Sequence, residues 1–244
     1  MKHVPNFITS LNLASGFISI IFILNGDINT ASWLVLLAMV FDFLDGFSAR
    51  LLKAYSDLGK ELDSLADVVS FGVAPGLIIY HLLLQSLESP DKAGLCFSVY
   101  PSLIFITISA IMPVCAALRL AIFNTDTTQT TSFKGLPTPA SALAVISFVI
   151  GAHYSGSAFL ISLVASPIFL IILSLSLSVL MVTRIPLLSL KFKSFKIKGN
   201  EGRYALIVLC TIMILAFGIA SIPGIIPIYI IVSTLSLLFS AESK

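Results

Sequence analysis

Long apolar runs separated by short polar stretches make up most of the chain. Runs of about 17 to 25 apolar residues are long enough to cross the hydrocarbon core of a bilayer as helices. Gly, Pro, Asn and Asp in the intervening stretches are typical of turns. The pattern predicts eight helices, at about residues 7–24, 30–55, 59–87, 99–123, 140–154, 157–183, 204–220 and 225–239. The predicted fold class is therefore an all-α integral membrane protein with about eight transmembrane helices.

The composition agrees with a membrane protein. Hydrophobic residues make up 57% of the 244 residues and charged residues 11%, whereas about 25% of residues are charged in an ordinary soluble domain. Apolar runs recur along the whole chain, so one membrane domain is expected and there is no room for a separate soluble domain. Membrane lipid is the expected surrounding partner, and a nucleic-acid partner is not expected.

The basic residues indicate how the predicted helices are oriented. With eight spans both termini lie on one side, together with 13 of the 14 lysines and arginines; only Lys92 lies opposite. Cytoplasmic loops carry such an excess of positive charge. The pattern predicts a multi-pass protein of the cell membrane whose termini face the cytoplasm. Residues 186–203 are predicted to be a basic cytoplasmic loop before the last two spans.

Four aspartates with helical spacing stand out in the second and third predicted helices. Residues three, four, seven or eight positions apart share one face of a helix. Two antiparallel helices joined by a tight turn can point such faces at each other, which would bring four carboxylates together at the cytoplasmic interface. Unneutralised carboxylates repel one another, and divalent cations with oxygen ligands are the usual remedy. The predicted metal ligands are Asp42, Asp45, Asp63 and Asp67.

Small residues and an arginine accompany the acids. Gly46, Ala49 and Gly59 share the acidic faces and remove side-chain bulk, so a large ligand can approach the backbone. Arg50 adds a planar cation suited to phosphate oxygens. Together these features predict a diphosphate substrate held by metal ions. A cation or proton transporter also uses intramembrane acids, and a single Asp can be a helix-packing hydrogen bond, so these alternatives stay open.

The complete pattern resembles the signature of the CDP-alcohol phosphatidyltransferases. It reads Asp42-x2-Asp45-Gly46-x2-Ala49-Arg50-x8-Gly59-x3-Asp63-x3-Asp67. The resemblance implies a six-helix core over residues 1–185, usually dimeric, followed here by the basic loop and by two additional spans over residues 204–244. It also implies that the aspartates hold two divalent ions, Mg²⁺ or Mn²⁺, against the CDP diphosphate. Asp67 would in addition act as the general base on the acceptor hydroxyl.

Four further stretches resemble the phosphatidylserine synthase branch of that family. They are residues 5–9, 70–76, 117–124 and 133–139. Ile122 departs from this branch, whose members often have a second arginine at that position. The resemblance implies transfer of the phosphatidyl group of CDP-diacylglycerol to the hydroxyl of L-serine, giving phosphatidylserine and CMP. The residues expected to contact CDP-diacylglycerol are Asn6, Thr9, Asp42, Asp45, Gly46, Ala49, Arg50, Gly59 and Asp63.

Recognition of serine requires groups for a carboxylate and an ammonium. Arg119, Asn124 and Lys134 are the candidates, because they lie on the predicted cytoplasmic side beside the stiff segment 135–139. Arg119 and Lys134 are also explained as ordinary positive-inside residues. Glycerol 3-phosphate or an inositol phosphate stays open as the acceptor, although a phosphorylated acceptor should require more cations near the pocket. The lipid tails, diacyl or archaeal ether, are left open as well.

Overall fold

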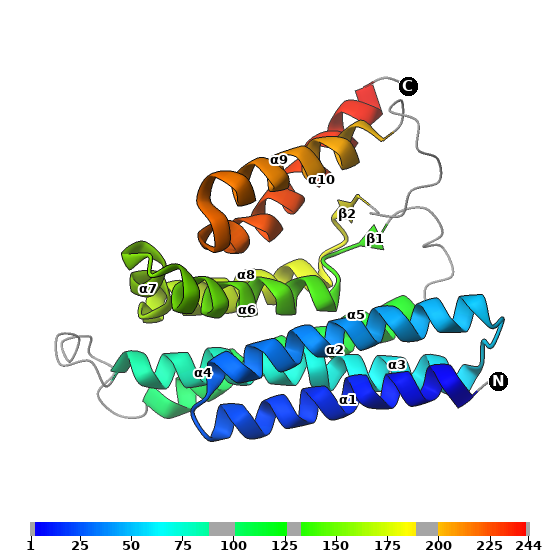
Figure 1. Ribbon diagram of the computed structural model, residues 1–244, viewed down its shortest axis with the longest axis horizontal. Helices are drawn as coiled ribbons and strands as arrows, with labels where there is room; N and C mark the ends of the chain where they lie inside the picture. Colours follow the sequence, from blue (N-terminus) through cyan, green and yellow to red (C-terminus); the bar gives the residue numbers. More distant parts are fainter. Residues whose placement is uncertain (1–2, 88–100, 126–132, 189–199, 243–244) are drawn as a thin grey trace.

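The computed structural model describes residues 3–87, 101–125, 133–188 and 200–242. The α-helices are α1 (His3–Leu24), α2 (Ile28–Leu51), α3 (Asp57–Asp67), α4 (Ala74–Leu87), α5 (Pro101–Thr125), α6 (Thr138–Ser155), α7 (Ala158–Val164), α8 (Pro167–Val182), α9 (Glu201–Phe217) and α10 (Ile225–Glu242). A π-helical segment, η1 (Val68–Val73), joins α3 to α4, and a 3-10 helix, η3 (Gly218–Gly224), joins α9 to α10. In Figure 1, α1 to α5 form one side of the molecule, α6 to α8 lie above them, and α9 with α10 lie outermost.

Several of these helices are long and apolar enough to cross a membrane. There are five among the described residues, or six if the bent pair of α7 and α8 counts as one span. The five segments are His3–Leu24, Asp57–Ser86, Leu103–Thr125, Thr138–Ser155 and Glu201–Ser236. The all-helical fold class is thus confirmed and these helices support the predicted membrane character, whereas eight spans remain a prediction.

The first two helices are joined by a tight turn, at the short polar stretch that separates the first two predicted helices. Gly26 adopts φ +84°, a conformation that glycine reaches without strain. Asp27 then caps α2 by accepting a hydrogen bond of 2.9 Å from the Thr30 N–H. Hydrogen bonds from the side chain and backbone of Thr30 lower the pKa of the Asp27 carboxyl. At its other end α2 stops before the predicted limit near residue 55, where Lys53 adopts φ 49° and breaks the helical conformation.

The third predicted helix has the expected extent but not the expected regularity. It begins at Asp57, where the Ser56 side chain accepts a hydrogen bond from the Gly59 N–H. Directly after Asp67 the chain passes through η1 before it continues as α4. Such π-helical segments occur often at functional sites. Local sequence gave no signal for this one.

The segment before α6 docks against the end of α8. Strand β1 (Phe133–Lys134) pairs antiparallel with β2 (Pro186–Leu187). Gly135 follows with φ +81°, and a Cβ on it would lie 2.6 Å from the carbonyl oxygen of Thr183. Only glycine fits this close approach, so the chain at Gly135 packs directly against the end of α8. The stiffness of the 135–139 segment remains a prediction, and its last two residues already belong to α6. The pairing with β2 was not predicted.

The prediction of one helix over residues 157–183 is wrong. The structure has two helices, α7 and α8, bent by 74° at the break. Pro167 opens α8, and Ser166 caps it by accepting a hydrogen bond from the Phe169 N–H. Proline has no N–H to continue the preceding helix but suits the first turn of a new one, so the chain bends there.

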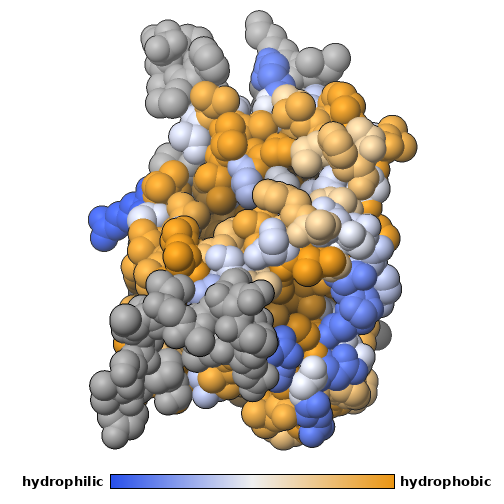
Figure 2. Space-filling model, turned by 90° about the vertical axis from the view of Figure 1, so that its left-hand side faces the viewer, coloured by the Kyte–Doolittle hydropathy of each residue, from blue (hydrophilic) through white to orange (hydrophobic). Residues whose placement is uncertain are grey.

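Buried apolar side chains join the two main layers, and further apolar side chains cover the outside. Phe71, Phe105 and Ile146 are among the fully buried side chains. Figure 2 shows hydrophobic residues over much of one outer face, and Leu215 on α9 is 81% exposed. Large exposed apolar patches mark contact with lipid or protein rather than water. The surface therefore fits a protein surrounded by lipid.

Candidate active site

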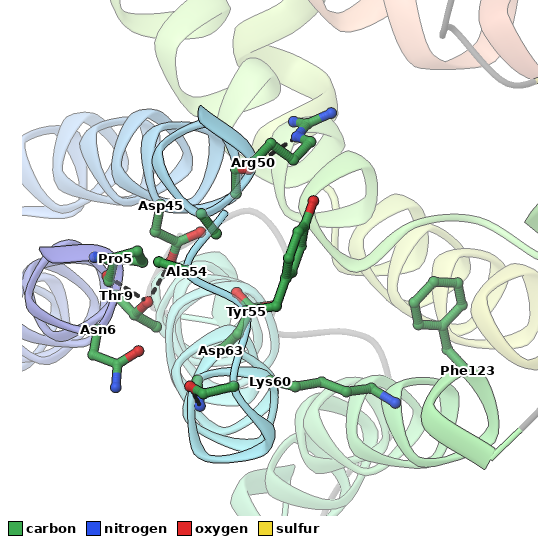
Figure 3. Close-up of a pocket in the computed structure, with 14 residues that line it drawn as sticks. Pro5, Asn6, Thr9, Asp45, Arg50, Ala54, Tyr55, Lys60, Asp63 and Phe123 are labelled. Carbon is green, nitrogen blue, oxygen red and sulfur yellow. Dashed lines mark hydrogen bonds between the residues drawn. The ribbon is translucent and has the colours of Figure 1, made fainter. Parts of the chain in front are cut away.

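An open pocket lies where the N-terminal part of α1 meets the end of α2 and the start of α3 (Figure 3). Its volume is about 480 Å³. Eight of the nine predicted CDP-diacylglycerol contacts line it, Asp42 being the exception. The lining residues are Pro5, Asn6, Thr9, Asp45, Gly46, Ala49, Arg50, Ala54, Tyr55, Ser56, Gly59, Lys60, Asp63 and Phe123.

Three of the four aspartates form a tight cluster beside this pocket. Carboxylate oxygens of Asp42, Asp63 and Asp67 all lie within 4.8 Å of one another. Asp67 is buried at the end of α3, and Asp63, one turn earlier, also lines the pocket. Acids on the facing sides of α2 and α3 thus meet in one cluster, as the helical spacing of the motif predicted.

Asp45 is oriented differently from the other three acids. Its Oδ2 accepts a hydrogen bond of 2.6 Å from the Thr9 hydroxyl on α1 (Figure 3). Asp45 is 5% exposed and lines the pocket. The fourth carboxylate therefore stands at the pocket wall next to the cluster, held by a helix that lies outside the motif.

The cluster has the chemistry of a site for divalent cations. Three carboxylates this close repel one another in a low-dielectric setting unless a cation neutralises them. In the described part of the chain, Asp63 Oδ1 is buried without a hydrogen-bond partner. Hard oxygen ligands of this kind suit Mg²⁺ or Mn²⁺. The residues present fit such ions.

The small residues of the motif have two different roles. A Cβ on Gly46 would meet only the Arg50 guanidinium, at 4.0 Å, so Gly46 leaves the pocket open. A Cβ on Gly59 would lie 2.9 Å from Asn6 Oδ1 and 3.0 Å from Ser56 Oγ. Gly59 therefore allows α3 to approach α1 closely, in addition to leaving space for a ligand.

The arginine of the motif lies at the rim. Arg50 lines the pocket, and its Nε donates a hydrogen bond of 2.9 Å to the Gly46 carbonyl of its own helix. Its charge is thus fixed over the end of α2 that borders the pocket. A guanidinium in this place can bind phosphate oxygens of a ligand in the pocket.

The predicted serine contacts separate into three cases. Arg119 on α5 is 8% exposed, its Nη2 donates a long hydrogen bond of 3.4 Å to the Gly135 carbonyl, and it interacts electrostatically with Asp67. Its Nε has no hydrogen-bond partner among the described residues. Asn124 instead links α5 to α3, since its Nδ2 donates to Ser64 Oγ at 2.8 Å. The backbone of Lys134 pairs with Pro186, and its side chain lies outside the described residues.

Sequence reasoning missed one buried residue next to the cluster. Asn12 on α1 is 0% exposed, and its Nδ2 lies 3.4 Å from Asp67 Oδ1. It continues a buried polar face of α1 that includes Thr9, Ser15 and Ser19 at helical spacing. That spacing in an otherwise apolar helix was the signal that could have found it. Lys60, which also lines the pocket, is three residues before Asp63 on α3, so the helical spacing of the motif could have found it. Tyr55 and Phe123 line the pocket from outside the two helices of the motif and have no such signal.

Comparison with known proteins gives consistent matches. A family model described as CDP-alcohol phosphatidyltransferase matches residues 2–183. A Bacillus subtilis protein named CDP-diacylglycerol–serine O-phosphatidyltransferase is 34% identical over 202 residues, which cover 83% of this chain and 96% of the relative. A Mycobacterium leprae protein of the same name is 32% identical over 96% of this chain and 72% of its own length. The archaetidylserine synthase of Methanothermobacter thermautotrophicus is 37% identical over 62% of this chain and 60% of its own length.

Proposed function

From the chain's membership of the CDP-alcohol phosphatidyltransferase family, we propose that it transfers the phosphatidyl group of CDP-diacylglycerol to the hydroxyl of L-serine, releasing CMP. The observation that carries the proposal is the cluster of Asp42, Asp63 and Asp67 within 4.8 Å, at the side of a pocket of about 480 Å³. The names of the Bacillus subtilis and Mycobacterium leprae relatives support serine as the acceptor. The products are phosphatidylserine and CMP.

The donor binds with its CDP head group in the pocket and its acyl chains in the surrounding lipid. Asn6 and Thr9 on α1 contact the nucleotide, and Arg50 at the rim binds phosphate oxygens. Gly46 and Ala49 leave room for the diphosphate along α2. The lining of the pocket by these residues supports this arrangement.

Divalent cations complete the site. Asp42, Asp45, Asp63 and Asp67 hold two of them, Mg²⁺ or Mn²⁺, and the unpartnered Asp63 Oδ1 supports this donor set. When bound, such ions supply Lewis-acid polarisation of the diphosphate and neutralise charge on the departing CMP.

Asp67 acts as the general base. It removes the proton from the serine hydroxyl, the serine oxygen forms a bond to the β-phosphorus, and the bond from that phosphorus to CMP breaks. The burial of Asp67 supports this role, because the carboxylate is shielded from bulk water. Arg119 binds the serine carboxylate, supported by its unpartnered Nε and its electrostatic interaction with Asp67. Asn124 and Lys134 border the same acceptor side.

The wider architecture follows the same family reading. Residues 1–185 form the transferase core, 186–203 a cytoplasmic loop, and 204–244 two further spans. The chain then has eight spans in total. The assembly is a homodimer, as is usual in the family. The end of the family match at residue 183 supports the core boundary. Thirteen of 14 basic residues on one side support an active site and termini that face the cytoplasm.

One comparison supports an alternative donor lipid. The archaetidylserine synthase relative, 37% identical over 154 residues, carries a name that points to an ether lipid. The proposed contacts in the pocket are to the CDP head group, which both donors share, so they do not distinguish the two lipids. CDP-archaeol is therefore the alternative donor for the same transfer to serine.

Release of CMP by the purified protein in lipid nanodiscs tests the proposal. CDP-diacylglycerol or CDP-archaeol is offered with L-serine, glycerol 3-phosphate, an inositol phosphate or no acceptor, with Mg²⁺, Mn²⁺ or a chelator. We expect CMP only with serine and a divalent ion. CMP with another alcohol alone would reassign the acceptor. Metal-driven ion flux in proteoliposomes without CMP release would replace the transferase by a transporter.

A further inference from the structure

A buried amide on α1 is joined to the acidic cluster although it lies outside the motif. Asn12 is 0% exposed, and its Nδ2 donates a hydrogen bond of 3.4 Å to Oδ1 of Asp67. The two residues are 55 positions apart in the chain. The contact is made to Oδ1 of Asp67, so the Oδ2 atom is not engaged by Asn12.

The backbone of Asn12 is fixed to the same turn of helix. Its carbonyl accepts a hydrogen bond of 3.1 Å from the Ser70 hydroxyl at the start of η1. One turn along α1, a Cβ on Gly16 would lie 2.8 Å from the Ser70 Cα, so the two helices touch without a gap. Asn12 thus contacts both ends of the segment 67–70 and has a fixed place relative to Asp67.

Packing alone does not explain an asparagine at this position. Its Oδ1 is buried and has no hydrogen-bond partner within the described ranges. The neighbouring polar residues of the same face are paired, since Thr9 donates to Asp45 and Ser19 donates to the Ala31 carbonyl. An unpaired buried acceptor costs stability, and an apolar side chain of similar shape would avoid that cost. Among the described residues, the contact of the amide N–H with Asp67 is the hydrogen bond that this side chain makes.

We propose that Asn12 is a positioning residue for Asp67. Its N–H holds the carboxylate in one rotamer, so that Oδ2 is aimed at the acceptor hydroxyl. The inference rests on the proposed role of Asp67 as general base. Partners of this kind orient catalytic groups without touching the substrate, and their loss reduces activity by about 10- to 100-fold.

Asn12→Leu and Asn12→Ala test the proposal, with Ser19→Ala as the matched control. Ser19→Ala removes a buried polar group from the same face of α1, at the end away from the acids. Melting temperature, the KM of each substrate, kcat, and the solvent deuterium isotope effect on kcat are measured in nanodiscs. Asn12→Leu removes the unpaired Oδ1 acceptor but also the N–H that donates to the buried Asp67 carboxylate, so we expect its melting temperature to stay close to that of wild type. Its kcat should fall about tenfold or more with both KM values within about twofold. Its isotope effect should rise, because proton removal becomes slower. Ser19→Ala should keep the wild-type kcat.

Three results overturn the proposal. They are an unchanged kcat in both Asn12 variants, an equal loss of kcat in Ser19→Ala, and melting of both Asn12 variants well below wild type, which would make Asn12 a packing residue. CMP release by the wild-type protein distinguishes failure of the positioning role from failure of the proposed transferase function. If wild type releases no CMP with serine, the transferase proposal fails. If wild type does so and the Asn12 variants match it, only the positioning role fails.

Discussion

The Thr9 hydroxyl lies 2.6 Å from Oδ2 of Asp45 and 3.0 Å from the carbonyl oxygen of Pro5 (Figure 3). A hydroxyl has one proton to donate, and the short distance to a carboxylate marks the bond to Asp45 as the stronger one. Helix α1 therefore orients the second acid of the motif, even though the motif itself lies on α2 and α3. The first helix is part of the site rather than a membrane anchor beside it.

Replacing Thr9 by Val should separate this orienting role from packing, because Val keeps the shape and removes the hydroxyl. We expect CMP release to fall by about 10- to 100-fold. The Mg²⁺ or Mn²⁺ concentration for half-maximal activity should rise, since Asp45 loses its fixed orientation. Thr9→Ser is the control and should stay within about threefold of wild type. A Thr9→Val protein as active as Thr9→Ser would contradict the role.

Asp67→Asn should abolish most of the turnover without preventing donor binding. Removal of a general base costs about 10² to 10⁴-fold in rate. Binding of CDP-diacylglycerol, measured by competition with a labelled nucleotide lipid, should persist if the pocket at Asp45 and Arg50 holds the head group. Retention of more than about a tenth of the wild-type kcat would argue against Asp67 as the base.

Arg119→Ala should act on the acceptor alone. A charged hydrogen bond contributes about 1.5 to 3 kcal/mol, so the KM for serine should rise by about 10- to 100-fold while the KM for CDP-diacylglycerol stays unchanged. Arg184→Ala is the control, because Arg184 is an exposed basic residue with the same charge. An unchanged KM for serine would remove Arg119 from the acceptor site and leave it as a positive-inside residue.

Gly59→Ala and Gly46→Ala should have opposite consequences. The new methyl at Gly59 would lie 2.9 Å from Asn6 Oδ1, and overpacking of this kind costs about 1 to 3 kcal/mol of stability. The methyl at Gly46 would project into the open pocket, so stability should be retained while the KM for CDP-diacylglycerol rises. Thermal unfolding and donor titrations measure the two effects. Equal loss of stability in both variants would contradict the two roles.

Divalent ions should stabilise the folded protein as well as activate it. A ligand at about 100 times its Kd adds about 2.7 kcal/mol to folded-state stability, so Mg²⁺ or Mn²⁺ should raise the melting temperature. Asp63→Asn removes one of the repelling carboxylates. We expect this variant to be at least as stable as wild type in a chelator and to lose most of the metal-dependent rise. Undiminished metal stabilisation in Asp63→Asn would place the ions elsewhere.

The parts of this structure that follow local rules could be predicted, and the parts set by distant contacts could not. The spacing of Asp63 and Asp67 predicted that both lie on one face of α3. The turn-forming residues around Gly26 predicted the break between α1 and α2. Pro167 is a local signal for the bend between α7 and α8, although the prediction treated residues 157–183 as one helix. The pairing of β1 with β2 and the link from Asn12 to Asp67 join segments more than 50 residues apart. Neither has a local signature of its own.

The π-helical segment η1 changes the helical register between the two halves of the helix from Asp57 to Leu87. A regular α-helix turns by about 100° per residue, so the direction of an acid at its start would dictate which residues meet the core at its end. The wider turn that begins after Asp67 changes this relation by a fixed amount, so α4 presents a different face than an uninterrupted α-helix would. The acids of α3 can therefore face the pocket while Phe71, Ile78 and Leu83 face the buried interior. The position of η1 therefore sets which side chains of α4 pack in the interior while the acids of α3 stay beside the pocket.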